Sequence, residues 1–335
     1  CGDSSFNVYD KDGNSFGFGP DADLNLFAGQ CVGCNLDGSN GCCNIFLGVC
    51  AGKDATSGHS NVALGRLTAK NLSTGDFNVF LGYSAGGYAG GGVTNNNNIA
   101  IGSEALKCLT SGASNVAIGQ AAGGGGATGS GSDNVMIGSY AGNAAADSSF
   151  IVAIGHQAGC NSGEQGGVFI GKYAGKSANA HGASIMIGCK AGCLAYTADS
   201  SIFIGKEAGM RACNSSHGNI FMGSAAGKGS STEANNTGDN NIAIGDNTMC
   251  DYTSATCNVV IGYYAGNDIS SGAGNVAIGQ CAGCTITTGS ENVALGQKAL
   301  GDGTVTGSHN IAMGYYAGYK NSSGACNVSI GYRAG

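Results

Sequence analysis

A short motif recurs through the chain at a nearly constant spacing, and this periodicity limits the folds open to it. Residues 275–279 read NVAIG, and residues 292–296 read NVALG. The glycine that closes each copy, here called the anchor glycine, occurs 18 times from Gly29 to Gly331, most often at intervals of 17 residues. A unit of this size cannot bury a core alone and must stack on its neighbours. The sequence therefore predicts a stack of tandem repeats.

Each unit predicts one short β-strand directly before its anchor glycine. The positions three and one before that glycine carry Val, Ile, Leu or Met, apart from Ala28. Positions two apart on a strand share a face, so this pair predicts one buried face. The position between them is apolar in every unit except the one with Ser329, so the opposite face is apolar as well. We expect that second face to be covered by another chain, because soluble monomers rarely expose large apolar bands. The candidate interface residues are the phenylalanines at the middle position: Phe27, Phe46, Phe80, Phe169, Phe203 and Phe221.

An asparagine stands four residues before the anchor glycine in 14 of the 18 units. Stacked asparagines can hydrogen-bond side chain to side chain, as they do in cross-β ladders. We therefore predict an asparagine ladder that includes Asn44, Asn61, Asn78, Asn115, Asn258, Asn275 and Asn292.

Composition agrees with a repetitive β fold. The 335 residues include 64 Gly, 16 Cys and one Pro, and 10% are charged. Collagen is excluded because Gly does not fall at every third place. No apolar run reaches the roughly 20 residues of a membrane helix, and scattered basic residues with a net charge of −7 argue against nucleic-acid binding. We expect an all-β, parallel β-solenoid of about 18 coils over residues 25–335. Residues 1–24 are predicted to be a cap or the end of a preceding region.

The repeats SNVAIG, ENVALG and NNIAIG, followed by x-x-Ala-Gly, resemble those in the heads of trimeric autotransporter adhesins. They resemble still more the NxAIGxxAG repeats in tail-fibre-like proteins of phages and related viruses. The resemblance implies a left-handed β-roll that winds with other copies around one axis, as a homotrimer or a filament, and attaches to surfaces without chemistry. The 17-residue period is longer than the adhesin head repeat, and 16 Cys are unusual in a passenger that crosses the outer membrane unfolded. These departures favour a viral or other extracellular fibre, located on a cell or virion surface.

The cysteines recur at fixed places in the repeat. Cys31 and Cys50 both lie two residues after an anchor glycine in consecutive units. Stacking would bring them to about 4.8 Å, inside the Cα separation of about 4.4–6.8 Å that a disulfide tolerates. We therefore predict a Cys31–Cys50 bond, and a second between Cys250 and Cys257. Cys281 and Cys284 are expected to bond to each other, to bond to another chain or to stay reduced. For the cysteines in general, cross-links between coils or chains are favoured over unpaired buried thiols and over a metal site.

Other motifs indicate no catalytic residue, cofactor or metal. Asp10, Asp12 and Asn14 resemble the start of a calcium loop, but Ser15 replaces its glycine and Asp21 its glutamate, which favours a polar turn. The five His are scattered singly and are expected to be solvated loop residues. No G-x-S-x-G elbow, phosphate-loop lysine or clustered carboxylate pair is present.

Three functions are compatible with this sequence. The favoured one is a structural fibre with an adhesive or host-attachment role, carried by corners and long insertions such as residues 87–97 and 228–240. The second is a module that binds a cell-surface glycan or receptor through corner tyrosines, which could equally pack between coils. The third, a β-helix polysaccharide-degrading enzyme, is disfavoured. The tyrosines in question are Tyr83, Tyr140, Tyr173, Tyr263, Tyr264, Tyr315 and Tyr316.

Overall fold

The computed structural model describes residues 6–9, 15–18, 24–36, 41–87, 93–125, 129–144, 148–162, 165–178, 184–212, 216–231 and 236–335. This part of the chain contains β-strands and turns and no helix. The strands are β1 (Phe6–Tyr9), β2 (Ser15–Phe18), β3 (Leu26–Ala28), β4 (Ile45–Leu47), β5 (Val62–Leu64), β6 (Val79–Leu81), β7 (Ile99–Ile101), β8 (Val116–Ile118), β9 (Val135–Ile137), β10 (Val152–Ile154), β11 (Val168–Ile170), β12 (Ile185–Ile187), β13 (Ile202–Ile204), β14 (Ile220–Met222), β15 (Ile242–Ile244), β16 (Val259–Ile261), β17 (Val276–Ile278), β18 (Val293–Leu295), β19 (Ile311–Met313) and β20 (Val328–Ile330).

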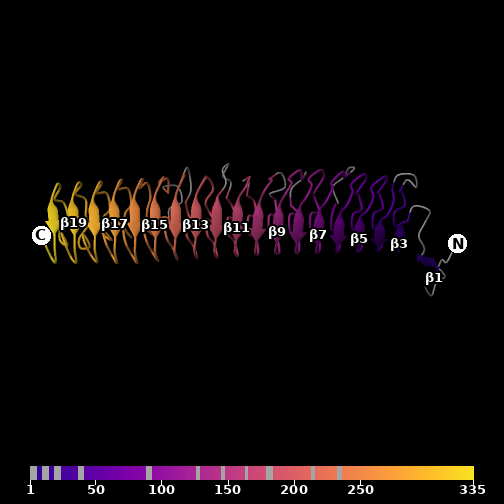
Figure 1. Cartoon of the computed structure of the whole chain (residues 1–335), viewed down its shortest axis with the longest axis horizontal. Coiled ribbons are helices and arrows are strands. Elements are labelled where there is room, and N and C mark those ends of the chain that lie inside the picture. Colours follow the sequence, from indigo (N-terminus) through magenta and orange to yellow (C-terminus); the bar gives the residue numbers. More distant parts are fainter. Residues whose placement is uncertain are drawn as a thin grey trace. The chain divides into compact units, whose positions relative to one another are not determined.

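The predicted parallel β-solenoid is confirmed, with one three-residue strand per repeat (Figure 1). The chain divides into two compact units, residues 1–161 and 162–335. In the first unit β1 and β2 form an antiparallel hairpin, and β3 to β10 pair in parallel, each with the next. In the second, β11 to β20 do the same. Equivalent residues are paired, as Val260 with Ala277, so each side chain stacks on its counterpart.

The anchor glycine is required by both its backbone angle and its neighbour. Gly262 has φ +132°, a conformation that residues with a side chain rarely adopt. A Cβ atom built there would lie 2.6 Å from the carbonyl oxygen of Gly279, the anchor of the next coil. The glycine column therefore lets consecutive coils approach closely at the point where each strand ends.

The structure reverses the sequence-based assignment of strand faces. The middle residue of β4 to β19 is buried in the coil, and Phe46, Phe80, Phe169, Phe203 and Phe221 are fully buried within one chain. The prediction that these five phenylalanines lie at an interface between chains is therefore wrong. Phe27 is half-buried and stacks on Phe46, with ring centroids 5.7 Å apart, so for Phe27 an interface stays a prediction. The Val, Ile, Leu and Met side chains on either side of the middle residues face outward instead.

In nine coils, core volume is balanced between the strand centre and the residue seven after the anchor glycine. Coils with a central Phe or Met carry a buried alanine at the later position in four cases: Ala55, Ala178, Ala195 and Ala212. Coils with a central Ala or Val carry a large residue there in five cases: Leu72, Leu109, Tyr252, Ile269 and Ile286. Protein interiors are close-packed, so a thin coil has room for one large side chain at this level.

Candidate functional site

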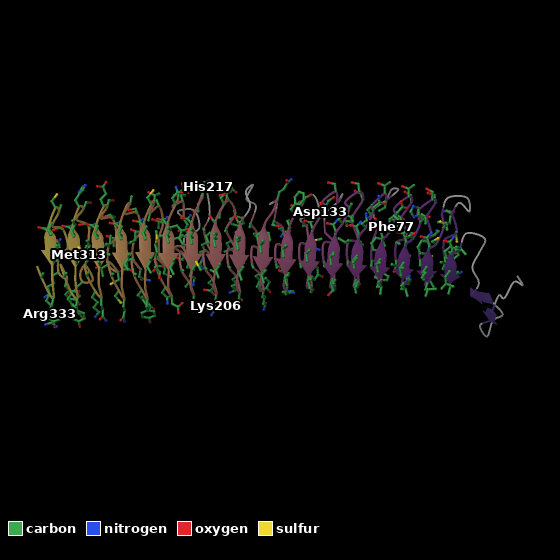
Figure 2. All side chains as sticks on the ribbon, viewed as in Figure 1. Phe77, Asp133, Lys206, His217, Met313 and Arg333 are labelled. Atoms are coloured by element: carbon green, nitrogen blue, oxygen red, sulfur yellow. The ribbon has the colours of Figure 1, made fainter. Side chains whose placement is uncertain are left out.

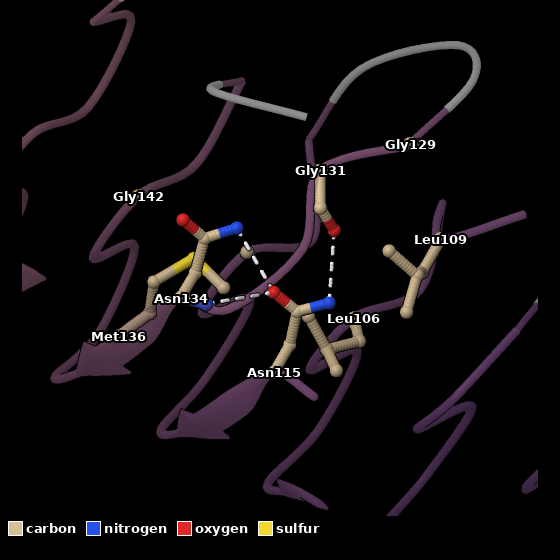
Figure 3. A pocket seen from close by; sticks show the side chains of 9 residues that line it. Leu106, Leu109, Asn115, Gly129, Gly131, Asn134, Met136 and Gly142 are labelled. Carbon is tan, nitrogen blue, oxygen red and sulfur yellow. Dashed lines mark hydrogen bonds between the residues drawn. The ribbon is translucent and has the colours of Figure 1, made fainter. Parts of the chain in front are cut away.

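The predicted asparagines lie in two buried columns that connect the coils. Asn44, Asn61, Asn78 and Asn115 belong to the first unit, and Asn258, Asn275 and Asn292 belong to the second. In Figure 3, Asn134 donates from its backbone N and its Nδ2 to Oδ1 of Asn115, at 3.1 and 2.9 Å. Asn115 donates from Nδ2 to the carbonyl oxygen of Gly131, at 2.9 Å. Each asparagine thus ties its own coil together and accepts two hydrogen bonds from the next.

A second polar ladder, which sequence reasoning missed, lies six residues before the anchor glycine. Here a side-chain oxygen accepts a hydrogen bond from the backbone N of the equivalent residue in the preceding coil. Asp76 accepts from His59 at 2.9 Å, Ser132 from Ala113 at 3.0 Å, and Asp239 from His217 at 2.7 Å. The signal in the sequence is the recurrence of Asp, Asn and Ser at this place, a weak signal because these residues are common in any turn.

The outer face of each sheet is apolar. In the second unit ten strands present twenty outward Val, Ile, Leu or Met side chains, and Ile244 and Ile278 are 36% and 39% exposed. Such a face exposes on the order of 1,000 Å², more than the roughly 300–600 Å² of the largest apolar patch on a typical monomer. The face is regular, because identical positions stack in register along the unit.

The two edges of the coils differ from this face. In Figure 2, His217 lies on the edge where the chain enters the strands of the second unit, and Lys206 and Arg333 lie on the opposite edge. At that opposite edge Tyr315 and Tyr332 stack between consecutive coils, with ring centroids 5.3 Å apart and an interplanar angle of 11°.

Cations cover the neighbouring tyrosine. Lys298 Nζ lies 5.2 Å from the ring centroid of Tyr316, and the Arg333 guanidinium carbon lies 5.7 Å from it. A hydrogen bond from Lys298 lowers the pKa of Tyr316. Tyr315 packs on the ring of the next coil, as one of the two alternatives predicted, while glycan binding by the corner tyrosines stays a prediction.

The six candidate cysteines form no disulfide in the structure: Cys31, Cys50, Cys250, Cys257, Cys281 and Cys284. The Cys31–Cys50 and Cys250–Cys257 bonds therefore stay predictions. Burial is the main cause that raises the pKa of Cys284 to about 11, and the neighbouring Cys281 thiol is the next. Burial also raises the pKa of Cys250, where the next contribution comes from Asp251.

Three histidines each meet a carboxylate on an adjacent coil. His59 Nε2 lies 3.3 Å from Asp76 Oδ2, and His309 Nε2 lies 3.1 Å from Glu291 Oε2. His217 Nδ1 lies 3.7 Å from Asp199 Oδ2. All three pairs are partly exposed, and surface pairs of this kind contribute about 0–1 kcal/mol to stability.

One cavity in the described part of the chain is very small and another is larger. A cavity beside Leu106, Asn115 and Met136 has a volume of about 10 Å³, enough for at most one water molecule (Figure 3). A hollow of about 340 Å³ lies against β20 and includes Lys320, Asn321 and Asn327 but no carboxylate, imidazole or thiol side chain.

The described residues show neither a metal-binding cluster nor a membrane helix. No group of three or more His, Cys, Asp or Glu in the ranges given above is placed to hold a metal ion. The calcium-loop candidates Asp10, Asp12, Asn14 and Asp21 lie outside the described residues. In the described ranges no helix is long and apolar enough to cross a bilayer.

Comparisons of the chain with protein-family models, with curated proteins and with solved structures found no match. The class of protein is therefore defined by the fold alone. It is a tandem-repeat parallel β-solenoid whose coils are joined by backbone pairing and two polar side-chain ladders.

Proposed function

We propose that the chain is a structural protein that forms an extracellular fibre or filament on a cell or virion surface by association of several copies. The observation that carries this proposal is the regular apolar outer face. Burying apolar surface contributes about 25 cal/mol per Å². A face on the order of 1,000 Å² could thus contribute on the order of 25 kcal/mol before the entropic costs of association.

The occupant of this face is a second copy of the same chain. Both partners then present the same three-residue strands at the same spacing, so side chains of equal size meet along the whole contact. Homo-oligomers with closed symmetry are the commonest solution for such self-complementary surfaces. A homotrimer closes around one axis, whereas a filament leaves the contact open at both ends, and the proposal covers both.

An adhesive role is part of the proposal and is assigned to the edges of the coils. Sequence insertions fall at turns, as at residues 82–102 and 223–245, where the anchor glycines are 20 and 22 residues apart, while the strands keep their register. Surface loops tolerate such length changes and commonly carry recognition. The hollow against β20 holds no carboxylate, imidazole or thiol side chain, which favours surface attachment over catalysis.

Electron microscopy of the purified chain tests the structural role. We expect elongated particles that contain more than one chain across their width. A field of single-chain particles at micromolar concentration would contradict the proposal, and so would turnover of a polysaccharide by the same preparation.

A further inference from the structure

In several coils the turn after the anchor glycine brings the residues two and five places after it together. Lys107 N donates to the carbonyl oxygen of Glu104 at 3.3 Å, and Cys193 N donates to that of Lys190 at 3.3 Å. The side chains at these two places also meet, because Lys107 Nζ lies 2.9 Å from Glu104 Oε1. The repeat therefore juxtaposes whatever two side chains occupy these positions.

Two coils carry cysteine at both positions. The pairs are Cys31 with Cys34 and Cys281 with Cys284. Cys31 and Cys281 have φ of +54° and +52°, like most residues at their place in the repeat, so the fold itself sets the turn. The thiols of Cys281 and Cys284 interact directly, and Cys284 Sγ lies 3.6 Å from the carbonyl oxygen of Gly301.

A bond between the paired thiols fits the turn. The ends of a β-turn have Cα atoms less than about 7 Å apart, and disulfides form at Cα separations of about 4.4–6.8 Å. Cys281 and Cys284 are both partly exposed, so a small reagent can reach them.

We propose that Cys281 and Cys284 form a reversible dithiol site that closes within its own turn by exchange with a small-molecule disulfide. The thiolate of Cys281 attacks one sulfur of the reagent, forms a mixed disulfide and releases one small thiolate. Cys284 then gives its proton to solvent and attacks Cys281 Sγ, which releases the second small thiolate. Two protein thiols are oxidised and one reagent disulfide is reduced to two thiols.

The order of attack follows from the environment of the two sulfurs. The thiolate is the nucleophile in thiol–disulfide exchange. Burial raises the pKa of Cys284, so this residue is a poor first nucleophile at neutral pH. It becomes effective as the second nucleophile, because the mixed disulfide then lies beside it within the same turn.

The pair Cys31 and Cys34 has a competitor that the other pair does not have. Cys50 stacks one coil further along the same column, and its backbone N donates to the carbonyl oxygen of Gln30 at 2.8 Å. Cys281 has Tyr264 and Lys298 at the equivalent places in the neighbouring coils. A bond first closed between Cys31 and Cys34 can therefore pass to Cys50, whereas the Cys281–Cys284 bond has no such route.

The test treats the reduced, purified chain with excess oxidised glutathione, traps free thiols by alkylation and maps the peptides by mass. We expect the peptide with Cys281 and Cys284 to lose two hydrogens and to carry no glutathione. In Cys284→Ser, glutathione should stay bound to Cys281; in Cys281→Ser, Cys284 should react more slowly. Cys326, an exposed thiol outside these turns that has no predicted partner, serves as the control and should keep its glutathione adduct.

Two results would overturn this proposal. One is a stable glutathione adduct on Cys281 in the unmodified chain; the other is full alkylation of Cys281 and Cys284 under conditions in which glutathione modifies Cys326. Amide exchange of Val276 and Val293, measured in both serine variants, shows whether the coils remain folded. The outcome does not depend on the fibre proposal, because it can be read on any assembly state.

Discussion

Replacement of Asn258 by alanine tests how the coils are held together. Asn258 donates from Nδ2 to Oδ1 of Asn241 at 3.0 Å and to the carbonyl oxygen of Gly272 at 2.9 Å. Its own Oδ1 accepts from the backbone N of Asn275 at 2.8 Å and from Nδ2 of Asn275 at 3.0 Å. The residue is fully buried, so water cannot simply replace these partners.

The expected cost follows from counting the groups that lose a partner. Alanine leaves the Gly272 carbonyl oxygen and the backbone N of Asn275 without this partner. Asn275 Nδ2 still donates to the Gly289 carbonyl oxygen at 2.9 Å, and Asn241 Oδ1 still accepts from the backbone N of residue 258 at 3.1 Å. Each buried unsatisfied group costs about 1–3 kcal/mol, so two groups cost about 2–6 kcal/mol. Asn258→Ser should cost less, because Ser184 bonds the Ala198 carbonyl oxygen from the same place in another coil, at 2.8 Å.

Amide hydrogen exchange followed by mass spectrometry measures this change locally. The peptides that contain Val259 and Val276 should lose protection in the alanine variant and keep more of it in the serine variant. Asn267→Ala is the matched control in the same coil, because Asn267 makes one partly buried bond to the Asn247 carbonyl oxygen, and should cost about 0.5–1.5 kcal/mol. Equal protection in Asn258→Ala and Asn267→Ala would refute the reasoning.

Three further changes test the core, the anchor and an ion pair. Gly262→Ala should lower the free energy of unfolding by about 3 kcal/mol or more in urea titrations, because it combines a φ of +132° with a Cβ clash. A loss below about 1 kcal/mol would contradict the close approach of Gly262 to the Gly279 carbonyl oxygen. Phe203→Ala should lower the free energy of unfolding by about 3–5 kcal/mol, and Ala212→Ile should lower it by overpacking the same coil. The double variant should be more stable than either single variant. Simple additivity of the two changes would contradict a core volume shared by these two positions. The hydrogen bond from Lys228 lowers the pKa of Glu207, so this pair stabilises the fold above about pH 4.5 and loses its effect as the pH falls through the folded-state pKa. Lys228→Met should remove this acid dependence. Thermal melts at several pH values measure the change, and the stability difference should stay below about 1 kcal/mol.

The sequence was sufficient to predict the repeat, the position of each strand and the buried asparagines. These features depend on local requirements that recur at a fixed phase: a glycine where φ is near +130°, an aliphatic strand before it, and an amide at the coil junction. A repeat shows each requirement many times, so one sequence is enough to establish them.

The facing of the strands could not be predicted from alternation, because both faces are apolar. Phe203 and its flanking Ile202 and Ile204 are equally hydrophobic, and only the structure shows that Phe203 points inward. The useful signal was the exchange of volume between the strand centre and the residue seven after the anchor glycine, as in Ala277 with Ile286. The hydrogen-bond ladder of Asp76 and Asp239 was missed because acidic residues in turns have many possible roles.

Sedimentation of outer-face variants measures the proposed association most directly. Ile244→Lys combined with Ile278→Lys places two charges on the apolar face of the second unit, and Gln280→Lys combined with Gln297→Lys places two charges on an exposed edge as the control. We predict that the unmodified chain and the edge variant sediment as the same oligomer at micromolar concentration, and that the outer-face variant sediments as a smaller species. An unmodified chain that is a single monomeric species, or an outer-face variant that keeps the full assembly, would contradict association through this face.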